Sequence, residues 1–418
     1  MGSILAVFCG CMCKNVQQNK HTFPDPHILN NRGPDANNSL RWNRDSFLTI
    51  WECRHLSVKI GIPGSLFYFR FASFWKSFFM NLGLDVVISG PTNRRILDDG
   101  VKSCVDEACL PIKLFFGHVQ NLKDRVDYIL VPRFTSISKN EYICPEFGGL
   151  PDMVRHTLKG LPKLIDTEVN MRKSIRGGIR AAVEVGAMLG ADRRKTVKAY
   201  QLAAQNFRRD QFFVEFAESV QRSGGRPGLV CQKGENCPRF GSGCDGTGET
   251  FPRPAAGTAG PSPCRSACRR KLCVGVIGHP YTVYDRYISM DLLGKLARYE
   301  VLARTIETVD EADINRQASA LAKPMFWNHG RLAYGAALHM AESGQVDGFI
   351  FLTSFGCGID SFVNDLIERH VRRRYSIPLI TMTIDEHTGE AGFNTRLEAF
   401  IDMLQWRRQN EGHISASG

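Results

Sequence analysis

Three cysteines, Cys109, Cys144 and Cys357, each lie where a loop leads into a predicted helix. A proline follows the first two within two residues, which is typical of the first turn of a helix, and glycines flank the third. Asp360 and Ser361 are expected to cap the helix that follows Cys357. Because a helix N-terminus carries partial positive charge, we predict that it lowers the thiol pKa, which favours reactive or metal-binding cysteines.

Short apolar runs alternate with helical patterns around these cysteines. The runs that predict strands are residues 58–63, 84–89, 126–134, 272–277, 301–304, 347–354 and 377–385. Strand–helix–strand alternation predicts parallel sheets with right-handed crossovers, and ligands gather at the carboxyl ends of such strands. We therefore predict an α/β fold of two Rossmann-like lobes with parallel sheets, in which the three cysteine loops converge on one rim.

Composition divides the chain into five predicted parts. They are a poorly ordered leader (1–57), an N-terminal α/β lobe with a helical extension (58–222), a flexible linker rich in Gly, Pro and Cys (223–271), a C-terminal α/β lobe (272–405) and a tail (406–418). The linker cysteines lack a Cys-x-x-Cys pair, so zinc is the less favoured interpretation there. We expect Cys104 to be a core residue, and Thr395 with Glu398 to form a capping box.

The net charge and the number of cysteines indicate which classes of partner and of cysteine chemistry are favoured. The 53 basic and 42 acidic residues give a formal charge of +11, which favours acidic partners. The basic clusters are interrupted on helical segments, so solvated helix faces are favoured over nucleic-acid contacts. No apolar run is long enough to span a bilayer, and we expect a cytoplasmic protein. In a chain of this length, 14 cysteines favour metal or redox use over a disulfide framework.

Three thiolates on rigid loop-to-helix turns fit a [4Fe-4S] cluster that has one iron without a cysteine ligand. That iron would offer a Lewis-acid position to water or a substrate oxygen. The helix N-termini and Lys113 are expected to offset the negative charge of the cluster. Polar residues near the predicted site are candidates for proton transfer or substrate positioning, and they are Glu107, His118, His279, Glu386 and His387.

Several segments in both halves of the chain carry a resemblance to a known family. In the first half they are Val58 to Phe79, Pro91 to Asn93, Asp106 to Lys113, Gly117-His118, Tyr142 to Pro145 and Gly149 to Asp152, and in the second half Ser354 to Gly358 and Asp385 to Glu390. The chain resembles the activase-related proteins of CoA-substrate-specific enzymes. Its second lobe resembles, more remotely, subunits of 2-hydroxyacyl-CoA dehydratase and benzoyl-CoA reductase. In those dehydratases three cysteines hold a [4Fe-4S] cluster between two lobes, and the matching positions are Cys109, Cys144 and Cys357.

The resemblance implies an iron–sulfur component in low-potential electron transfer or reductive acyl-CoA chemistry, and it implies that the cluster site lies between the lobes. The implied partners are an ATP-driven activase or another low-potential electron donor, an acyl-CoA substrate and a partner subunit. The chain lacks a Gly-x-x-x-x-Gly-Lys-[Ser/Thr] loop, so we do not expect it to hydrolyse ATP.

Three alternatives remain open at this stage. The first is a non-catalytic scaffold or cluster-delivery protein, which would hold a cluster without turnover. The second is a metal-free enzyme whose nucleophile Cys357 is activated by His387 or His279. The third is a nucleic-acid-binding protein, which salt-sensitive DNA binding would indicate.

Overall fold

The computed structural model describes residues 57–209 and 271–414, and these residues belong to one compact unit of the chain. The predicted leader up to residue 56 and almost all of the predicted linker lie outside the described residues. Each lobe is built on a four-stranded sheet whose strands are all parallel. The predicted α/β class with two Rossmann-like lobes is therefore confirmed.

The first lobe contains a main sheet in the order β2-β1-β3-β5 and a small second sheet that pairs β4 with β6. The main strands are β1 (Lys59–Ile62), β2 (Asp85–Ile88), β3 (Tyr128–Leu130) and β5 (Lys163–Ile165). The small sheet consists of β4 (Arg133–Ser136) and β6 (Glu168–Asn170). The prediction of one strand over 126–134 was wrong, because β3 and β4 belong to different sheets. Pro132 lies at the break, where it has no N–H to donate to a strand neighbour.

Helices surround the first-lobe sheets. They are α2 (Tyr68–Asn81), α3 (Arg94–Ser103), α4 (Leu110–Leu122), α5 (Pro145–Thr157), α6 (Arg176–Met188) and α7 (Arg193–Arg209). Helices α3 and α4 approach closely through glycines: a Cβ on Gly117 would lie 1.9 Å from the carbonyl oxygen of Ile96, and one on Gly100 would lie 2.0 Å from that of Lys113. This close packing fixes α4, whose N-terminus begins directly after Cys109.

The second-lobe sheet has the strand order β10-β9-β7-β8. Its strands are β7 (Cys273–Ile277), β8 (Leu302–Thr305), β9 (Gly348–Ser354) and β10 (Leu379–Ile384). Every residue of β9 is buried, and its side chains alternate between two apolar clusters: Phe349 and Phe351 join one, and Ile350 and Leu352 join the other. Because both faces of this strand are buried, its sequence is a continuous run of mostly apolar residues and does not alternate between apolar and polar residues.

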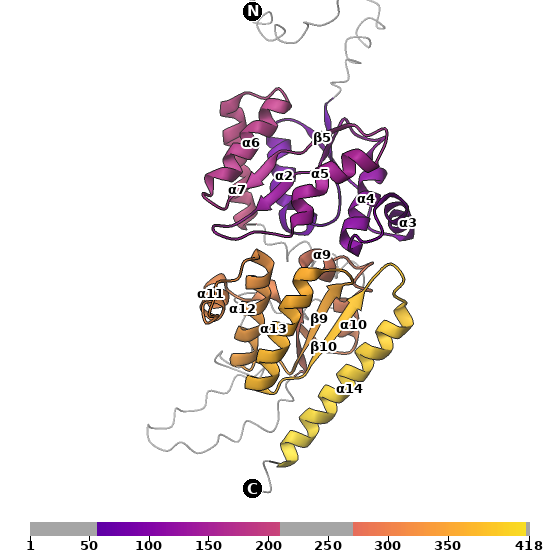
Figure 1. Cartoon of the computed structure of the whole chain (residues 1–418), viewed down its shortest axis with the longest axis vertical. Helices are drawn as coiled ribbons and strands as arrows, with labels where there is room; N and C mark the ends of the chain where they lie inside the picture. The colour runs from indigo at the N-terminus through magenta and orange to yellow at the C-terminus, as the bar shows by residue number, and fades with distance from the viewer. Residues whose placement is uncertain (1–56, 210–270, 415–418) are drawn as a thin grey trace, which may run out of the picture. The chain divides into compact units, whose positions relative to one another are not determined.

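Helices cover both faces of the second-lobe sheet. The cluster that contains Phe351 includes residues of α12 (Asn328–Glu342) and α13 (Gly358–Tyr375), which Figure 1 shows side by side. The opposite cluster includes residues of α10 (Leu292–Arg298) and α14 (Glu390–Ile414). Shorter elements complete the lobe, namely α9 (Pro280–Val283), the 3-10 turn η2 (Ile306–Thr308) and α11 (Glu311–Ala318).

The predicted capping box at the last helix was wrong. Helix α14 begins at Glu390, so Thr395 lies inside it and donates a hydrogen bond to the carbonyl oxygen of Ala391. Glu398 instead accepts a 2.6 Å hydrogen bond from the Tyr299 hydroxyl. The helix also runs on to Ile414, past the residue 405 boundary expected for the lobe.

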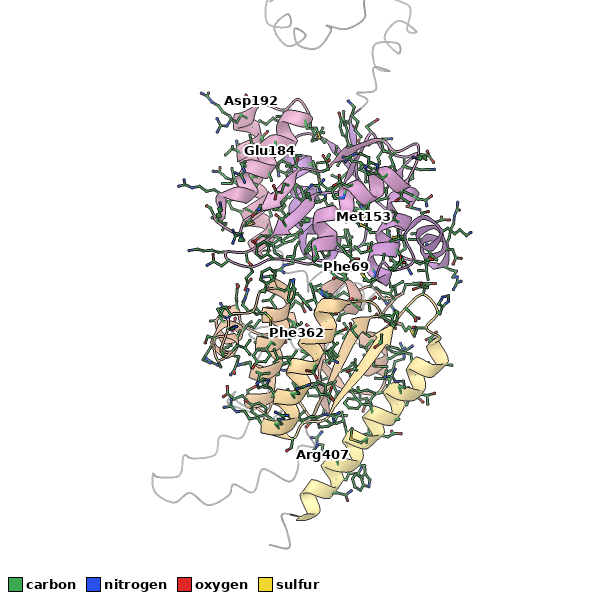
Figure 2. All side chains as sticks on the ribbon, viewed as in Figure 1. Phe69, Met153, Glu184, Asp192, Phe362 and Arg407 are labelled. Carbon is green, nitrogen blue, oxygen red and sulfur yellow. The ribbon has the colours of Figure 1, made fainter. Side chains whose placement is uncertain are left out.

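Apolar residues of the two lobes share a core. Leu110 and Leu114 of α4 belong to the same buried cluster as Val274 and Val276 of β7. Phe69 of α2, labelled in Figure 2, packs against this cluster and against the first-lobe core as well. Among the described helices, none combines the length and apolar composition that crossing a lipid bilayer requires.

Candidate metal centre

Cys109, Cys144 and Cys357 are the N-cap residues of α4, α5 and α13. Their predicted place at helix N-termini is therefore confirmed, and a proline occupies the first turn of α4 and of α5. Gly356 precedes Cys357 with φ +80°, in the left-handed region that favours glycine, so this residue permits the turn into α13. Asp360 and Ser361 do not cap that helix, contrary to prediction: Ser361 donates to the carbonyl oxygen of Cys357, and the Asp360 carboxylate is buried.

The three cysteine side chains are neighbours. The Oε2 atom of Glu146 accepts a hydrogen bond from the Sγ of Cys109 at 3.5 Å and from the Sγ of Cys144 at 3.8 Å. A charge on Cys357 or on Cys144 would raise the pKa of Cys109, and Cys144 has the same effect on Cys357. All three thiols are partly buried. Two first-lobe thiols and one second-lobe thiol thus face a common region.

The prediction that helix N-termini lower the thiol pKa was wrong. Burial raises the pKa of Cys144 to about 11 and that of Cys357 to about 12, and it raises the pKa of Cys109 further. Nearby carboxylates, Asp360 for Cys357 and Glu146 for the other two, add to the effect. Desolvation of a thiolate outweighs the helix charge here. This environment opposes the hypothesis of a metal-free enzyme in which Cys357 attacks as a thiolate.

Two contacts between the lobes lie near the start of α4, directly after Cys109. The backbone N–H of Leu110 donates to the Ser354 hydroxyl at 3.2 Å. The ammonium of Lys113 lies 2.5 Å from a carboxylate oxygen of Glu386, which follows β10. The sequence predicts that Lys113 offsets the negative charge of a cluster, but in the structure its ammonium forms an ion pair with the Glu386 carboxylate.

Cys104 and His118 take structural places in the first lobe. Cys104 caps the C-terminal end of α3 and packs against the core of the lobe, as predicted. His118 is fully buried, with Nδ1 hydrogen-bonded to Ser89 and Nε2 to Thr92, and burial lowers its pKa to about 4. It lies nine residues along α4 from Cys109, which corresponds to roughly 13 Å.

Glu107 and His387, two other candidates, are exposed. Glu107 lies in the turn before Cys109, and its backbone carbonyl approaches Gly356. His387 donates its backbone N–H to Asp385 in the turn after β10. Glu107 and His387 thus lie at the surface, whereas His279 lines a cavity together with Cys144 that does not include His118.

His279 belongs to a buried group that includes a histidine missed in the sequence. It is the N-cap residue of α9, and its ring stacks on His329 with centroids 3.5 Å apart. Its Nε2 lies 3.2 Å from Oδ1 of Asp360. His329 stands in the first turn of α12, after an aromatic residue and an asparagine, which is the same loop-to-helix setting that drew attention to the cysteines.

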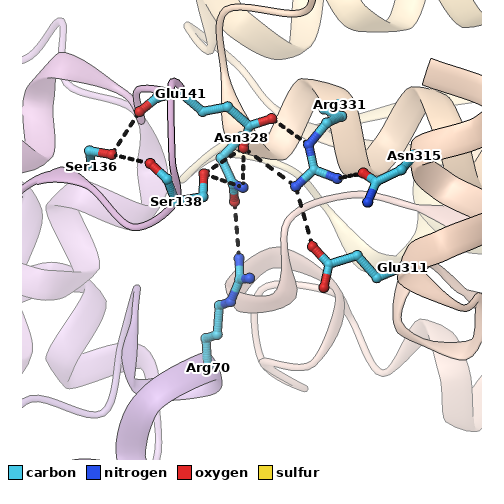
Figure 3. Close-up of polar contacts among 8 residues, drawn as sticks. All are labelled: Arg70, Ser136, Ser138, Glu141, Glu311, Asn315, Asn328 and Arg331. Atoms are coloured by element: carbon cyan, nitrogen blue, oxygen red, sulfur yellow. Dashed lines mark hydrogen bonds and ion pairs between the residues drawn. The ribbon is translucent and has the colours of Figure 1, made fainter. Parts of the chain in front are cut away.

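A polar network, drawn in Figure 3, holds the start of α12, where His329 stands. Asn328 accepts a hydrogen bond from Arg70 of the first lobe at 3.2 Å and donates one to Glu141 at 2.7 Å. Arg331, one turn further along α12, pairs with the same Glu141 carboxylate. First-lobe side chains therefore hold the residue that directly precedes His329.

Two family models match the chain. The model described as CoA enzyme activase uncharacterised domain (DUF2229) matches residues 59–309, which include Cys109, Cys144 and His279. The model described as 2-hydroxyglutaryl-CoA dehydratase, D-component, matches residues 294–404, which include Cys357 and Asp360. No curated protein matches the chain. Since the first model covers more than half of the sequence, the chain belongs to the CoA enzyme activase uncharacterised domain family.

Proposed function

We propose that this chain is a [4Fe-4S] protein that acts in low-potential electron transfer or reductive acyl-CoA chemistry, with Cys109, Cys144 and Cys357 as the cluster ligands. The observation that carries the proposal is the meeting of three thiols, each the N-cap of a different helix, in one partly buried region. Thiolates are the usual ligands of iron–sulfur clusters, and the positions come from three separate loops of rigid strand–helix units.

Three helix N-termini favour a negatively charged cluster, whereas burial and the carboxylates of Glu146 and Asp360 oppose it. Helices α4, α5 and α13 are long enough to have full N-terminal partial charges, each equivalent to roughly half a positive charge. Partial burial limits solvent access and so strengthens these interactions. The raised thiol pKa values mean that ligand binding must displace protons from the cysteines, which makes cluster assembly depend on pH.

Once bound, such a cluster transfers single electrons and, at an iron without a cysteine ligand, acts as a Lewis acid. The protein residues around it would position the reacting groups. Of the residues predicted for this role, His279 is placed best, because it is buried beside Asp360 and lines a cavity with Cys144. Glu386 is engaged by Lys113, so we propose that it positions the turn after β10 rather than transferring a proton.

The names of the matching families support a proposal about partners. One description names a CoA enzyme activase and the other a component of 2-hydroxyglutaryl-CoA dehydratase. We propose that a separate ATP-driven protein or another low-potential donor reduces the cluster. We also propose an acyl-CoA as the substrate of the complete system and a second subunit that completes it.

The test is anaerobic purification of the full chain with iron and acid-labile sulfide analysis and low-temperature EPR after reduction. We expect about four irons and four sulfides per chain. Cys109→Ala, Cys144→Ala and Cys357→Ala should each lose the cluster or change its EPR spectrum. Cys104→Ala is the matched control, since this cysteine is also partly buried but caps the C-terminal end of α3 and packs against the first-lobe core.

A folded, iron-free wild-type protein would refute the proposal, and so would three alanine variants with unchanged iron content and spectra. If the cluster is present, acyl-CoA turnover with a reducing activase separates a catalyst from a cluster carrier.

A further inference from the structure

The second lobe contains a group of metal-ligand types that does not involve the cysteines. His279 follows β7, Asp360 stands in the first turn of α13 after β9, and His329 stands in the first turn of α12. Strands β7 and β9 are neighbours in the parallel sheet, so the turns after them meet at one edge. Residues far apart in the sequence are therefore brought together by the sheet order.

The distances suit one small cation. His279, His329 and Asp360 each offer one ligand atom, and these three atoms lie within 4.8 Å of one another. The Nε2 of His279 lies 3.2 Å from Oδ1 of Asp360, and the Nε2 of His329 lies 3.9 Å from the same oxygen. The side chain of Asp360 is 1% exposed, which excludes solvent from this oxygen.

Two of the ligand atoms have no hydrogen-bond partner among the described residues. They are the buried Nε2 of His329 and the buried Oδ1 of Asp360. The Nε2 of His279 approaches Oδ1 of Asp360 to 3.2 Å as an ion-pair contact whose angles fall outside full hydrogen-bond geometry. Buried polar atoms are rarely left unpaired in proteins, and a cation bound between this nitrogen and this oxygen would give both a partner.

Asp360 is also oriented as metal ligands usually are. Its second oxygen, Oδ2, accepts a 3.1 Å hydrogen bond from the Thr353 hydroxyl at the end of β9. Such an outer partner fixes the direction of a ligating carboxylate. On the α12 side, the hydrogen bonds of Asn328 to Arg70 and Glu141 hold the backbone next to His329.

We propose that His279, His329 and Asp360 bind a single divalent transition-metal ion. Two imidazoles and one carboxylate are the donor set of open three-ligand sites for Zn²⁺ and Fe²⁺. Both histidines line a cavity together with Cys144, Tyr281 and Asn328. A small molecule in this cavity would therefore have access to the ion, which would polarise an oxygen of that molecule.

This proposed metal site is separate from the proposed cluster site. Its three ligands come from the second lobe alone and include no thiol. Substitution of the cluster cysteines therefore leaves the ion in place.

The test uses Co²⁺ added to the full chain that carries Cys109→Ala, Cys144→Ala and Cys357→Ala, purified with a chelator. Equilibrium dialysis and visible absorption give the stoichiometry and the ligand type. We expect one Co²⁺ whose visible bands persist without the near-ultraviolet charge-transfer band of a cobalt thiolate. His329→Gln and Asp360→Asn on the same background should each weaken this binding at least 100-fold.

His339→Gln is the matched control, because His339 also faces a carboxylate, Asp313, at 4.0 Å in the same lobe. Its Co²⁺ binding should be unchanged. Circular dichroism checks that each variant is folded, and His329→Gln remains informative if Asp360→Asn does not fold. Absence of stoichiometric Co²⁺, or binding that both variants leave intact, overturns the proposal. Iron and sulfide analysis of the wild type is a separate measurement, so failure of the cluster and failure of this site are distinguishable.

Discussion

The ion pair between Lys113 and Glu386 joins the two lobes, and Glu386→Gln tests how much it stabilises them. The nitrogen and oxygen lie 2.5 Å apart, and the side chains are 5% and 19% exposed. Removing one partner of a buried pair leaves an uncompensated charge and costs about 3–5 kcal/mol. Because Glu386 keeps some solvent contact, we expect a cost somewhat below that range, about 2–3 kcal/mol of unfolding free energy at pH 7.

The pH dependence gives this prediction a second readout. Burial acts to raise the pKa of Glu386, but the hydrogen bond and charge of Lys113 outweigh it, and the pKa lies below its ordinary value. A carboxyl group with a depressed pKa in the folded state stabilises the fold above its unfolded pKa. This contribution is lost as the pH falls through the folded value. The difference between wild type and Glu386→Gln should therefore be constant near neutrality and shrink below about pH 4.

The assay is urea denaturation of the full chain followed by tryptophan fluorescence and circular dichroism, with both probes compared because two lobes need not unfold together. Asp365→Asn is the control. Its partner Arg369 lies 2.9 Å away, but both side chains are about 60% exposed, so we expect a cost of only about 0.3–0.5 kcal/mol. Equal costs for the two variants at pH 7 would refute the reasoning that burial makes the Lys113 pair important.

Three further predictions concern packing and thiol chemistry. Gly117→Ala should destabilise the fold by about 1–3 kcal/mol in urea denaturation, because the new methyl group meets the Ile96 carbonyl, while Gly149→Ala, which meets nothing within 4 Å, should be tolerated. Phe351→Ala should cost about 3–5 kcal/mol by the same assay, since Phe351 is fully buried, whereas Phe355→Ala at a 70% exposed position should cost little. In metal-free protein at pH 8, iodoacetamide should modify Cys144 and Cys357 at least about 100-fold more slowly than a small thiol, as measured by mass spectrometry of their peptides, because their pKa values are about 11 and about 12. Modification at the rate of a small thiol would contradict the account of their burial.

Local signals explain what the sequence predicted well. Apolar runs identified the strands, including the fully buried β9, and a proline or glycine beside each cysteine identified the N-caps of α4, α5 and α13. These features depend on neighbours a few residues away. The end of one strand and the start of the next at Pro132 also had a local signal, which the interpretation of 126–134 as one strand overlooked.

What depends on tertiary contacts was not predicted. His329 approaches His279 and Asp360 only because β7 and β9 lie side by side and α12 packs next to α13. The sign of the thiol pKa shift was wrong because burial, which the sequence does not state, exceeds the helix charge at Cys144 and Cys357. The capping box failed because Glu390, rather than Thr395, begins α14.

The three cysteines come from two different lobes, and this has a consequence for the stability of the protein. Cys109 and Cys144 precede helices of the first lobe, and Cys357 precedes a helix of the second. Any ligand that binds all three must also hold the lobes together, so its binding free energy and the free energy of lobe association are linked. Loss of such a ligand would loosen the chain most at the junction between the lobes, and a variant at Cys357 would remove that link while leaving both first-lobe sulfurs in place.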